Sequence, residues 1–255
     1  MRADVFSGRR AIVTGASRGI GAAIAARLAQ AGAIAVLIGR DAKALREQND
    51  RIPYSQSAIC DVTDAAQVEQ IFSELLGEAP VDILVNNAGA AESAPFLKTS
   101  DAVLERMLSV NLRSAFRCSR AVLPGMLARG YGRIVNVSSI AGLRGYPYVT
   151  AYVAAKHALV GFTRALAMEV VQKGITVNAV CPGYTDTDLV RGAASAISAK
   201  TGRSEQEVVQ EMIRSNPQGR LIRLEEIAET VAWLCGPETD SITGQAIPIA
   251  GGEIM

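Results

Sequence analysis

Two side chains whose types and spacing suit proton transfer are Tyr152 and Lys156. They are four positions apart in a segment of helical pattern, so both point to one face of the expected helix. A phenol with a pKa of about 10 is a poor base at neutral pH, and lowering that pKa by about 3 units requires about 4 kcal/mol. A lysine ammonium about 4 Å away supplies roughly that energy at an effective dielectric constant of about 20. The pair therefore predicts an acidified tyrosine that gives and takes a proton; an ordinary helix pair is the alternative.

A glycine-rich segment, TGASRGIG at Thr14–Gly21, joins the first expected strand to a helical pattern. Glycine permits a tight turn and a close approach of the backbone to a pyrophosphate, whose oxygens then face the N–H groups and dipole of the new helix. This position at the first strand-to-helix crossing favours a dinucleotide site over an ordinary turn. The residues expected at the phosphates are Gly15, Ser17, Arg18, Gly19, Ile20 and Gly21.

The end of the second expected strand bears on the choice of cofactor. An acidic residue there would bind the ribose 2′-hydroxyl and repel a 2′-phosphate, but Gly39 occupies the position. Arg40 and Arg18 are placed to hold the phosphate by charge-assisted hydrogen bonds. We therefore expect NADP(H) in preference to NAD(H), which stays the alternative, as does a solvated role for either arginine. Asp41 either opposes this preference or caps the next helix.

Asp61 and Val62 follow the third expected strand, where the adenine of such a cofactor lies. The Asp61 carboxylate is placed to accept a hydrogen bond from the exocyclic amine. A helix N-cap is the equal alternative for this residue.

Short apolar runs alternate with longer helical patterns along the whole chain. Near-continuous apolarity indicates strands covered on both faces, hence a parallel sheet. The expected strands are Arg10–Thr14, Ile34–Ile38, Val81–Val85, Arg133–Val137, Ile175–Val180 and Ala246–Ile249, with Ser57–Cys60 as a weaker candidate. The expected helices are Ile20–Ala31, Ala65–Leu76, two within Asp101–Arg129 divided near Pro124, Tyr152–Lys173 and Glu225–Cys235. The fold class is α/β: one Rossmann-type, doubly wound parallel sheet of about seven strands in a single domain over 1–255.

The bulk composition excludes several classes of protein. The net charge of +1 is not that of a nucleic-acid-binding or polybasic membrane-binding protein. No apolar run reaches the roughly 18 residues that span a bilayer. A single histidine leaves no basis for a metal site. Four cysteines without a C-x-x-C pair indicate buried free thiols and a reducing compartment, most simply the cytoplasm; they are Cys60, Cys118, Cys181 and Cys235.

Taken together, the motifs resemble the single-domain short-chain dehydrogenase/reductase family. In chain order they are the glycine motif of Thr14–Gly21, N-N-A-G at Asn86–Gly89, Asn111, Ser139, Y-x-x-x-K at Tyr152 and Lys156, and Pro182-Gly183 with Thr187. The resemblance covers almost the whole chain and implies the sheet order 3-2-1-4-5-6-7. It also implies hydride transfer between a nicotinamide and a carbonyl or alcohol carbon.

The resemblance assigns roles to these positions. Asn111, Ser139, Tyr152 and Lys156 are the implied catalytic residues: Ser139, rather than its neighbour Ser138, holds the substrate oxygen, and Lys156 also binds the nicotinamide ribose. Asn111 is expected to kink its helix and hold a proton-relay water. Asn86 is expected to tie strands together. The remaining implied cofactor contacts are Asn87, Ala88, Gly89, Pro182, Gly183 and Thr187.

The substrate is less well defined by the sequence. The segment 188–216, helical in pattern from Ser204 to Arg214, resembles the substrate lid of the family. Its length is similar to that of 3-hydroxybutyrate dehydrogenases, but the positions that bind a carboxylate in those enzymes are here Ala91, Ala141 and Val149, which cannot bond an anion. Arg144, Tyr146 and Tyr184 are further candidate substrate contacts, with a solvated Arg144 as the equal alternative.

We therefore expect a 3-oxoacyl thioester and its 3-hydroxy product as the small-molecule substrate pair, with a cyclic or aromatic ketone as the alternative. An epimerase or dehydratase of the extended relatives is disfavoured because this chain leaves no room for their larger substrate domain. A non-enzymatic NADP(H) sensor is disfavoured because all four catalytic positions are retained. By resemblance, Glu225–Gly252 mediates subunit pairing in a homotetramer.

Overall fold

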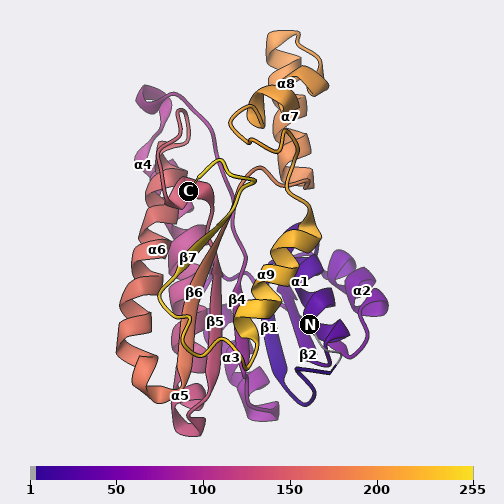
Figure 1. Ribbon diagram of the computed structural model, residues 1–255, viewed down its shortest axis with the longest axis vertical. Helices are drawn as coiled ribbons and strands as arrows, with labels where there is room; N and C mark the ends of the chain where they lie inside the picture. The colour runs from indigo at the N-terminus through magenta and orange to yellow at the C-terminus, as the bar shows by residue number, and fades with distance from the viewer. Residues whose placement is uncertain (1–3, 255) are drawn as a thin grey trace.

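The structure is a computed structural model that describes residues 4–254 apart from the side chain of Leu189. Seven parallel strands run in the order β3-β2-β1-β4-β5-β6-β7 (Figure 1), which confirms the expected fold class and strand order. They are β1 (Arg10–Thr14), β2 (Ile34–Gly39), β3 (Ser55–Ile59), β4 (Ile83–Asn86), β5 (Gly132–Val137), β6 (Ile175–Pro182) and β7 (Ala246–Ile249). Every residue of β1, β4, β5 and β6 is buried, which explains their unbroken apolar runs.

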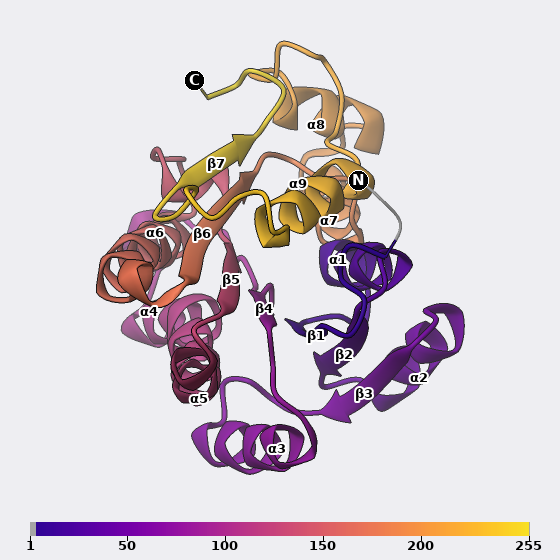
Figure 2. The ribbon, with the colours of Figure 1, turned by 60° about the horizontal axis from the view of Figure 1, so that its bottom comes forward.

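Helices cover both faces of the sheet (Figure 2). Leu28, Leu45 and Ile227 belong to one apolar core, which brings α1, α2 and α9 onto one face. Phe72, Met126 and Leu166 belong to a second core, which brings α3, α5 and α6 onto the other face. The helices are α1 (Gly19–Gln30), α2 (Ala42–Arg51), α3 (Ala65–Glu78), α4 (Asp101–Leu108), α5 (Ser114–Arg129), α6 (Thr150–Val170), α7 (Asp188–Thr201), α8 (Glu205–Met212) and α9 (Leu224–Cys235).

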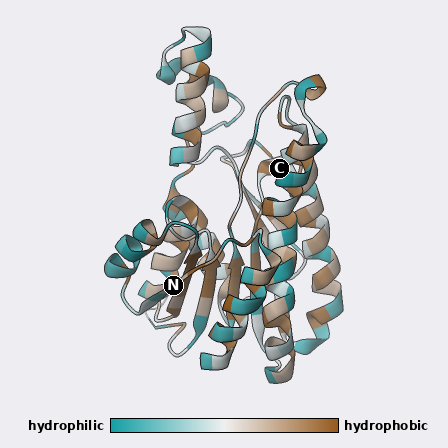
Figure 3. Cartoon of the chain, turned by 180° about the vertical axis from the view of Figure 1, so that it is seen from behind, coloured by the Kyte–Doolittle hydropathy of each residue, from teal (hydrophilic) through white to brown (hydrophobic). Residues whose placement is uncertain are grey.

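The hydropathy of the chain follows these layers. Hydrophobic residues gather on the strands, and hydrophilic residues gather on the outward sides of the helices (Figure 3). Within residues 4–254, none of the helices combines the length and the apolar character that crossing a bilayer requires. All four cysteines are buried free thiols, as expected.

The expected division of Asp101–Arg129 near Pro124 is wrong. The break is a π-helical turn at Ser109–Arg113, between α4 and α5, whereas Pro124 lies inside α5. Proline removes one backbone hydrogen bond and displaces the carbonyl four residues earlier. Because Pro124 and Arg120 are both exposed, that carbonyl lies on the solvent side of α5, where water satisfies it. Asn111, where a kink was expected, lies in this π-helical turn.

Smaller differences concern element ends and two helices. The weak third strand starts at Ser55 rather than Ser57, and the fourth ends at Asn86 rather than Val85. The sequence patterns did not predict α2 or α7. The helical pattern from Ser204 is α8, and Ser204 caps it through a reciprocal bond with Glu207.

A helical hairpin, α7 and α8, projects beyond the carboxyl edge of the sheet (Figure 1). Its two helices pack against each other. Its base is held by a parallel bridge between Thr185 and Ile222, in which the Asp186 N–H donates to the Ile222 carbonyl and the Ile222 N–H donates to the Tyr184 carbonyl. This hairpin rises from the same edge as the pocket described next.

Candidate active site

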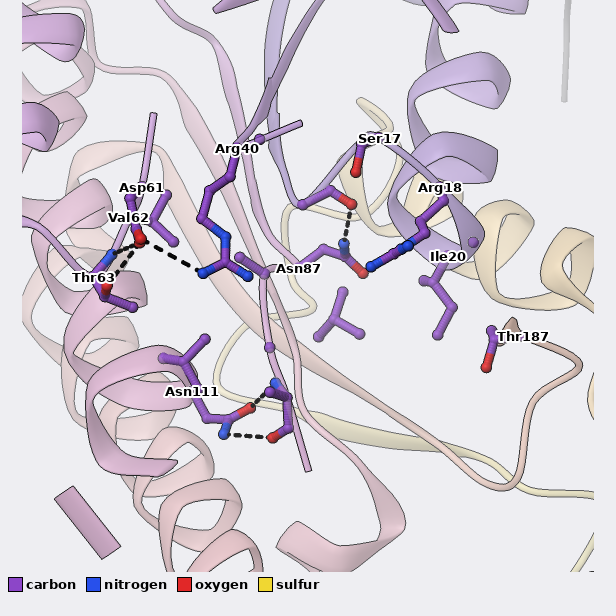
Figure 4. A pocket seen from close by; sticks show the side chains of 18 of the residues that line it. Ser17, Arg18, Ile20, Arg40, Asp61, Val62, Thr63, Asn87, Asn111 and Thr187 are labelled. Carbon is purple, nitrogen blue, oxygen red and sulfur yellow. Dashed lines mark hydrogen bonds and ion pairs between the residues drawn. The ribbon is translucent and has the colours of Figure 1, made fainter. Parts of the chain in front are cut away.

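A pocket of about 470 Å³ lies at the carboxyl edge of the sheet (Figure 4). Most of the residues expected at a cofactor line it: Gly15, Ser17, Arg18, Gly19, Ile20, Arg40, Asp61, Val62, Asn87, Ala88, Gly89, Tyr152, Lys156 and Thr187, together with Asn111. Gly21, Pro182, Gly183 and Ser139 are not among its lining residues. Lining residues for which the sequence suggested no role are Cys60, Thr63, Ala90, Val110, Val137 and Asp188. Cys60, Thr63 and Ala90 follow strands β3 and β4, whereas Val110 lies in the π-helical turn before α5.

The glycine loop requires its glycines for backbone reasons. Gly15 and Gly19 have φ angles of +66° and +56°, which side chains other than glycine rarely adopt. A Cβ on Gly21 would overlap the Gly15 carbonyl and the Asn87 amide. The Asn87 amide donates to the carbonyls of Thr14 (2.9 Å) and Gly15 (3.1 Å), so this side chain supports the loop. Gly21 therefore shapes the pocket from beneath.

The first turn of α1 is open to an anion. Its N-cap residue is Arg18, whose side chain makes no capping hydrogen bond, and the turn contains no acidic residue. Backbone N–H groups at such a helix start, together with the helix dipole, attract negative charge. The loop and the helix start thus form a cradle with the donor set and the space that a pyrophosphate needs.

Arg40 and Asp61 lie closer together than the sequence suggested. The Arg40 guanidinium is 3.6 Å from the Asp61 carboxylate, and its side chain is 76% exposed. Burial raises the pKa of Asp61, but hydrogen bonds from Thr63 and the charge of Arg40 outweigh it, so that the pKa lies below its ordinary value. Asp41 caps α2 by accepting from the N–H groups of Lys43 and Ala44, and it also lines the pocket.

Asp61 is not a helix N-cap. Its carboxylate accepts from the backbone and hydroxyl of Thr63, whereas Asp64 caps α3. One Asp61 oxygen therefore closes a local turn, and the other faces Arg40 across the pocket wall (Figure 4).

Tyr152 and Lys156 lie on one face of α6 and both line the pocket, but their electrostatics differ from the expectation. The Lys156 ammonium donates to the Val137 carbonyl (2.8 Å) and lies 5.6 Å from the centroid of the Tyr152 ring. Burial lowers the pKa of Lys156 to about 8. Burial also raises the pKa of Tyr152, against a lowering effect of its hydrogen bond with Ser139. The expected acidification of Tyr152 by Lys156 is therefore wrong for this state, because desolvation dominates and the ammonium is bonded elsewhere.

The two neighbouring serines have different surroundings. The Ser139 hydroxyl accepts from the Ala141 N–H (3.1 Å) and shares a hydrogen bond with Tyr152. The Ser138 hydroxyl donates to the Lys156 carbonyl (3.2 Å) and is buried. Ser139 is therefore the serine that bonds to Tyr152. Ser138 joins the turn after β5 to α6.

Asn111 lies in the π-helical turn and reaches across to the loop after β4. Its amide donates to the carbonyls of Ala90 (2.9 Å) and Met107 (3.0 Å), and its oxygen accepts from the Ala90 N–H (3.3 Å). A Cβ on Gly89 would be 2.8 Å from the Asn111 oxygen and 3.5 Å from the Lys156 nitrogen. The wide turn thus brings Asn111 beside Lys156 and fixes the loop at the pocket floor.

The other motif residues hold the frame. The Asn86 amide donates to Asn136 (2.8 Å) and Ser119 (3.1 Å), so it joins β4 to β5 and α5 as expected. Pro182 ends β6, and the Gly183 N–H donates to the Ile249 carbonyl of β7. Thr187 caps α7 through its hydroxyl, and its methyl group is 3.6 Å from the position of a Cβ on Gly19.

The candidate substrate residues form two groups. Arg144 and Tyr146 both bond to Glu253, which the sequence analysis missed because no local pattern marks it. Ala91 is exposed, Ala141 is buried, Val149 is the N-cap residue of α6 and Tyr184 is half-buried; none of the six lines the pocket. Among residues 4–254, no group of histidine, cysteine and acidic side chains is arranged to hold a metal ion.

Comparison with known proteins gives matches along almost the whole chain. The family model described as Enoyl-(Acyl carrier protein) reductase matches residues 15–253. The 3-oxoacyl-[acyl-carrier-protein] reductase of Escherichia coli is 36% identical, over 98% of this chain and 99% of that protein. The D-beta-hydroxybutyrate dehydrogenase of Rhizobium meliloti is 35% identical, over 96% of this chain and 98% of that protein.

Among solved structures, a point variant of the actinorhodin polyketide ketoreductase with NADPH superimposes with a TM-score of 0.93. It is 35% identical, and the match covers 99% of both chains. The chain belongs to the short-chain dehydrogenase/reductase family of oxidoreductases, as its motifs indicated.

Proposed function

We propose that this protein catalyses the NADP(H)-dependent interconversion of a 3-oxoacyl thioester and its 3-hydroxyacyl thioester. The observation that carries the proposal is that Tyr152 and Lys156, on one face of α6, line the same pocket as the glycine loop. The hydrogen bond of Ser139 with Tyr152 supports it. When bound, the cofactor supplies the hydride, and the protein supplies position and a proton.

The roles of the chain's own groups follow from this arrangement. Ser139 holds the substrate oxygen next to Tyr152. Tyr152 donates its proton to that oxygen in the reduction direction and takes it back in the oxidation direction. A raised pKa keeps the Tyr152 hydroxyl protonated at neutral pH, which suits reduction. Lys156 supports the tyrosine and binds the ribose, and Asn111 holds the proton-relay route beside it.

Gly39, Arg40 and Arg18 support NADP(H) as the cofactor. The strand-end glycine offers no carboxylate to repel a 2′-phosphate, and both arginines line the pocket. The matched ketoreductase structure contains NADPH. Pro182 and Gly183 are proposed to approach the nicotinamide from beyond the lining residues, with Thr187 bonding its carboxamide.

The thioester assignment is supported by the Escherichia coli relative. A free 3-hydroxy acid is disfavoured, although a hydroxybutyrate dehydrogenase is also similar, because Ala91, Ala141 and Val149 offer no polar side-chain atom to a carboxylate. A cyclic ketone is the second candidate, favoured by the similarity to a polyketide ketoreductase.

We further propose one catalytic domain over 1–255, with 188–216 as its substrate lid, and a homotetramer. Large apolar side chains are exposed on α5, α6 and α9, as an assembly surface requires: Phe116, Leu127, Met168 and Trp233. Buried free thiols support a reducing compartment such as the cytoplasm. Light scattering after gel filtration measures the subunit count, and a monomer would contradict the tetramer.

The experiment is to follow NADPH oxidation with acetoacetyl-CoA as substrate, for the wild type, Tyr152→Phe and Tyr54→Phe. Tyr54 is 78% exposed, so it is a matched control. We expect Tyr152→Phe to lose at least about 10³-fold in kcat with NADPH affinity nearly unchanged. Retained activity in that variant would remove the proposed proton donor, and a wild type without activity on acetoacetyl-CoA would remove the thioester assignment.

A further inference from the structure

A buried carboxylate lies where the loop before α6 meets the segment after β7. The side chain of Glu253 is only 2% exposed. One of its oxygens is 3.0 Å from the Arg144 guanidinium and accepts from the Tyr146 hydroxyl at 2.7 Å. The guanidinium stacks over the Tyr146 ring, 4.7 Å from its centroid. We refer to Arg144, Tyr146 and Glu253 as the carboxylate cluster.

The carboxylate cluster borders the proposed substrate space. Ile140 follows Ser139, and both Ile140 and Ala250 lie within 4 Å of the position of a Cβ on Gly183. The Glu253 N–H donates to the Ala250 carbonyl, which folds the segment back at this point. Glu253 is therefore anchored next to the strand ends that carry Ser139 and Pro182-Gly183.

Tyr184 connects the cluster to the tyrosine of the site. Burial raises the pKa of Tyr184, and the negative charge of Glu253 raises it further. Tyr184 in turn is among the groups that raise the pKa of Tyr152, after burial. The positive charge of Arg144 opposes this effect of Glu253 on Tyr184. Gly183, the residue before Tyr184, donates its N–H to the Ile249 carbonyl, so the chain that carries Tyr184 runs beside the strand that leads to Glu253.

The two charged side chains of the cluster differ in their exposure to water. The Arg144 side chain is 43% exposed, so water screens its charge, whereas the Glu253 carboxylate is shielded from water. The Tyr146 hydroxyl and one guanidinium nitrogen of Arg144 bond to Glu253, so these two donors are not free to bind an anionic substrate. The inner side of the cluster is therefore negative, although the ion pair is formally neutral.

We propose that Glu253 determines the charge preference of the substrate site: it excludes 3-oxo acids with a free carboxylate and admits their uncharged esters and thioesters. This inference rests on the proposed function and adds a residue that sets its substrate class. Glu253 acts by its charge and by holding Arg144 and Tyr146, and it takes no part in the proton transfer.

The test compares acetoacetate with ethyl acetoacetate, which share the reacting ketone and differ in charge. For Glu253→Gln, we expect the ratio of kcat/KM for acetoacetate to that for ethyl acetoacetate to rise roughly tenfold. For Arg144→Gln, which leaves the buried carboxylate unpaired, the same ratio falls. Opposite shifts in these two variants are not produced by a loss of packing alone.

Glu78→Gln is the matched control. Glu78 forms an ion pair with Arg10 (2.7 Å) at the amino end of β1, the opposite edge of the sheet. The ratio in this variant should equal that of the wild type, since the same charge is removed far from the pocket.

A binding measurement separates this inference from the proposed function. Dissociation constants of acetoacetate and ethyl acetoacetate are measured by calorimetry with NADP⁺ present, a combination in which no reduction occurs. A wild type that binds ethyl acetoacetate but reduces neither it nor acetoacetyl-CoA contradicts the proposed function, and the binding ratio still tests Glu253. Equal ratios in the wild type, Glu253→Gln and Arg144→Gln, with unchanged melting temperatures, would overturn the charge preference.

Discussion

Arg40→Ala tests the cofactor preference most directly. A hydrogen bond to a charged group contributes about 1.5–3 kcal/mol. Because the Arg40 side chain is 76% exposed, we take the lower end, about 1.5 kcal/mol, which corresponds to a roughly 12-fold weaker binding of NADPH. The variant also leaves the Asp61 carboxylate without its neighbour at 3.6 Å, and that carboxylate then repels the 2′-phosphate. We therefore expect a total loss of about 10- to 50-fold.

NADH lacks the phosphate, so its affinity should change by less than about threefold. The assay is titration of each cofactor by its fluorescence, at one fixed ionic strength because exposed charges are screened by salt. Arg46→Ala is the control: Arg46 is exposed on α2 and does not line the pocket. An equal loss for both cofactors in Arg40→Ala would refute the assignment of the 2′-phosphate to Arg40.

Three further variants test the loop and the catalytic floor. Gly21→Ala should abolish NADPH binding because its Cβ overlaps the Gly15 carbonyl, whereas Gly77→Ala, with open space around its Cβ position, should bind normally and stabilise α3 by about 0.5–1 kcal/mol in urea unfolding. Lys156→Met should be inactive yet more stable without cofactor at pH 7, by about 1 kcal/mol: a fall in pKa from 10.5 to about 8 costs about 3 kcal/mol, and the lost hydrogen bond of the ammonium offsets about 2. Since the folded pKa is the lower one, wild-type stability should rise between pH 8 and about 10.5, and Lys156→Met should lack this rise; a wild type without it would contradict the buried charge. Ser139→Ala should lower kcat by about 10²-fold or more and leave the NADPH dissociation constant unchanged, and weaker NADPH binding would argue against a role at the substrate oxygen.

The sheet and most of the pocket were predictable because their signals are local. Fully buried parallel strands have unbroken apolar runs, and a glycine loop after β1 has a fixed place in such a fold. Arg40 and Asp61 were each assigned to the cofactor from their positions at strand ends. Their approach to each other was not predictable, because it depends on how two loops fold over the pocket.

The errors have a common origin in tertiary environment. A proline in a helical pattern signals a break, yet Pro124 is tolerated because its freed carbonyl lies on the solvent side of α5. The spacing of Tyr152 and Lys156 predicted an acidified phenol, but spacing does not report that burial dominates both pKa values or that the ammonium bonds to Val137. Glu253 follows the last strand and pairs with residues 107 or more positions earlier, so no sequence window contains the cluster.

The hairpin of α7 and α8 is built separately from the sheet. Its helices pack on each other, and its base is fixed at the single bridge between Thr185 and Ile222. The sheet buries its own cores beneath separate helices, so the stability of the scaffold and the proposed covering of the substrate reside in different stretches of chain. Such a hairpin can be exchanged: grafting another between Asp188 and Ile222 would alter the proposed substrate cover and would keep Thr187 at the pocket.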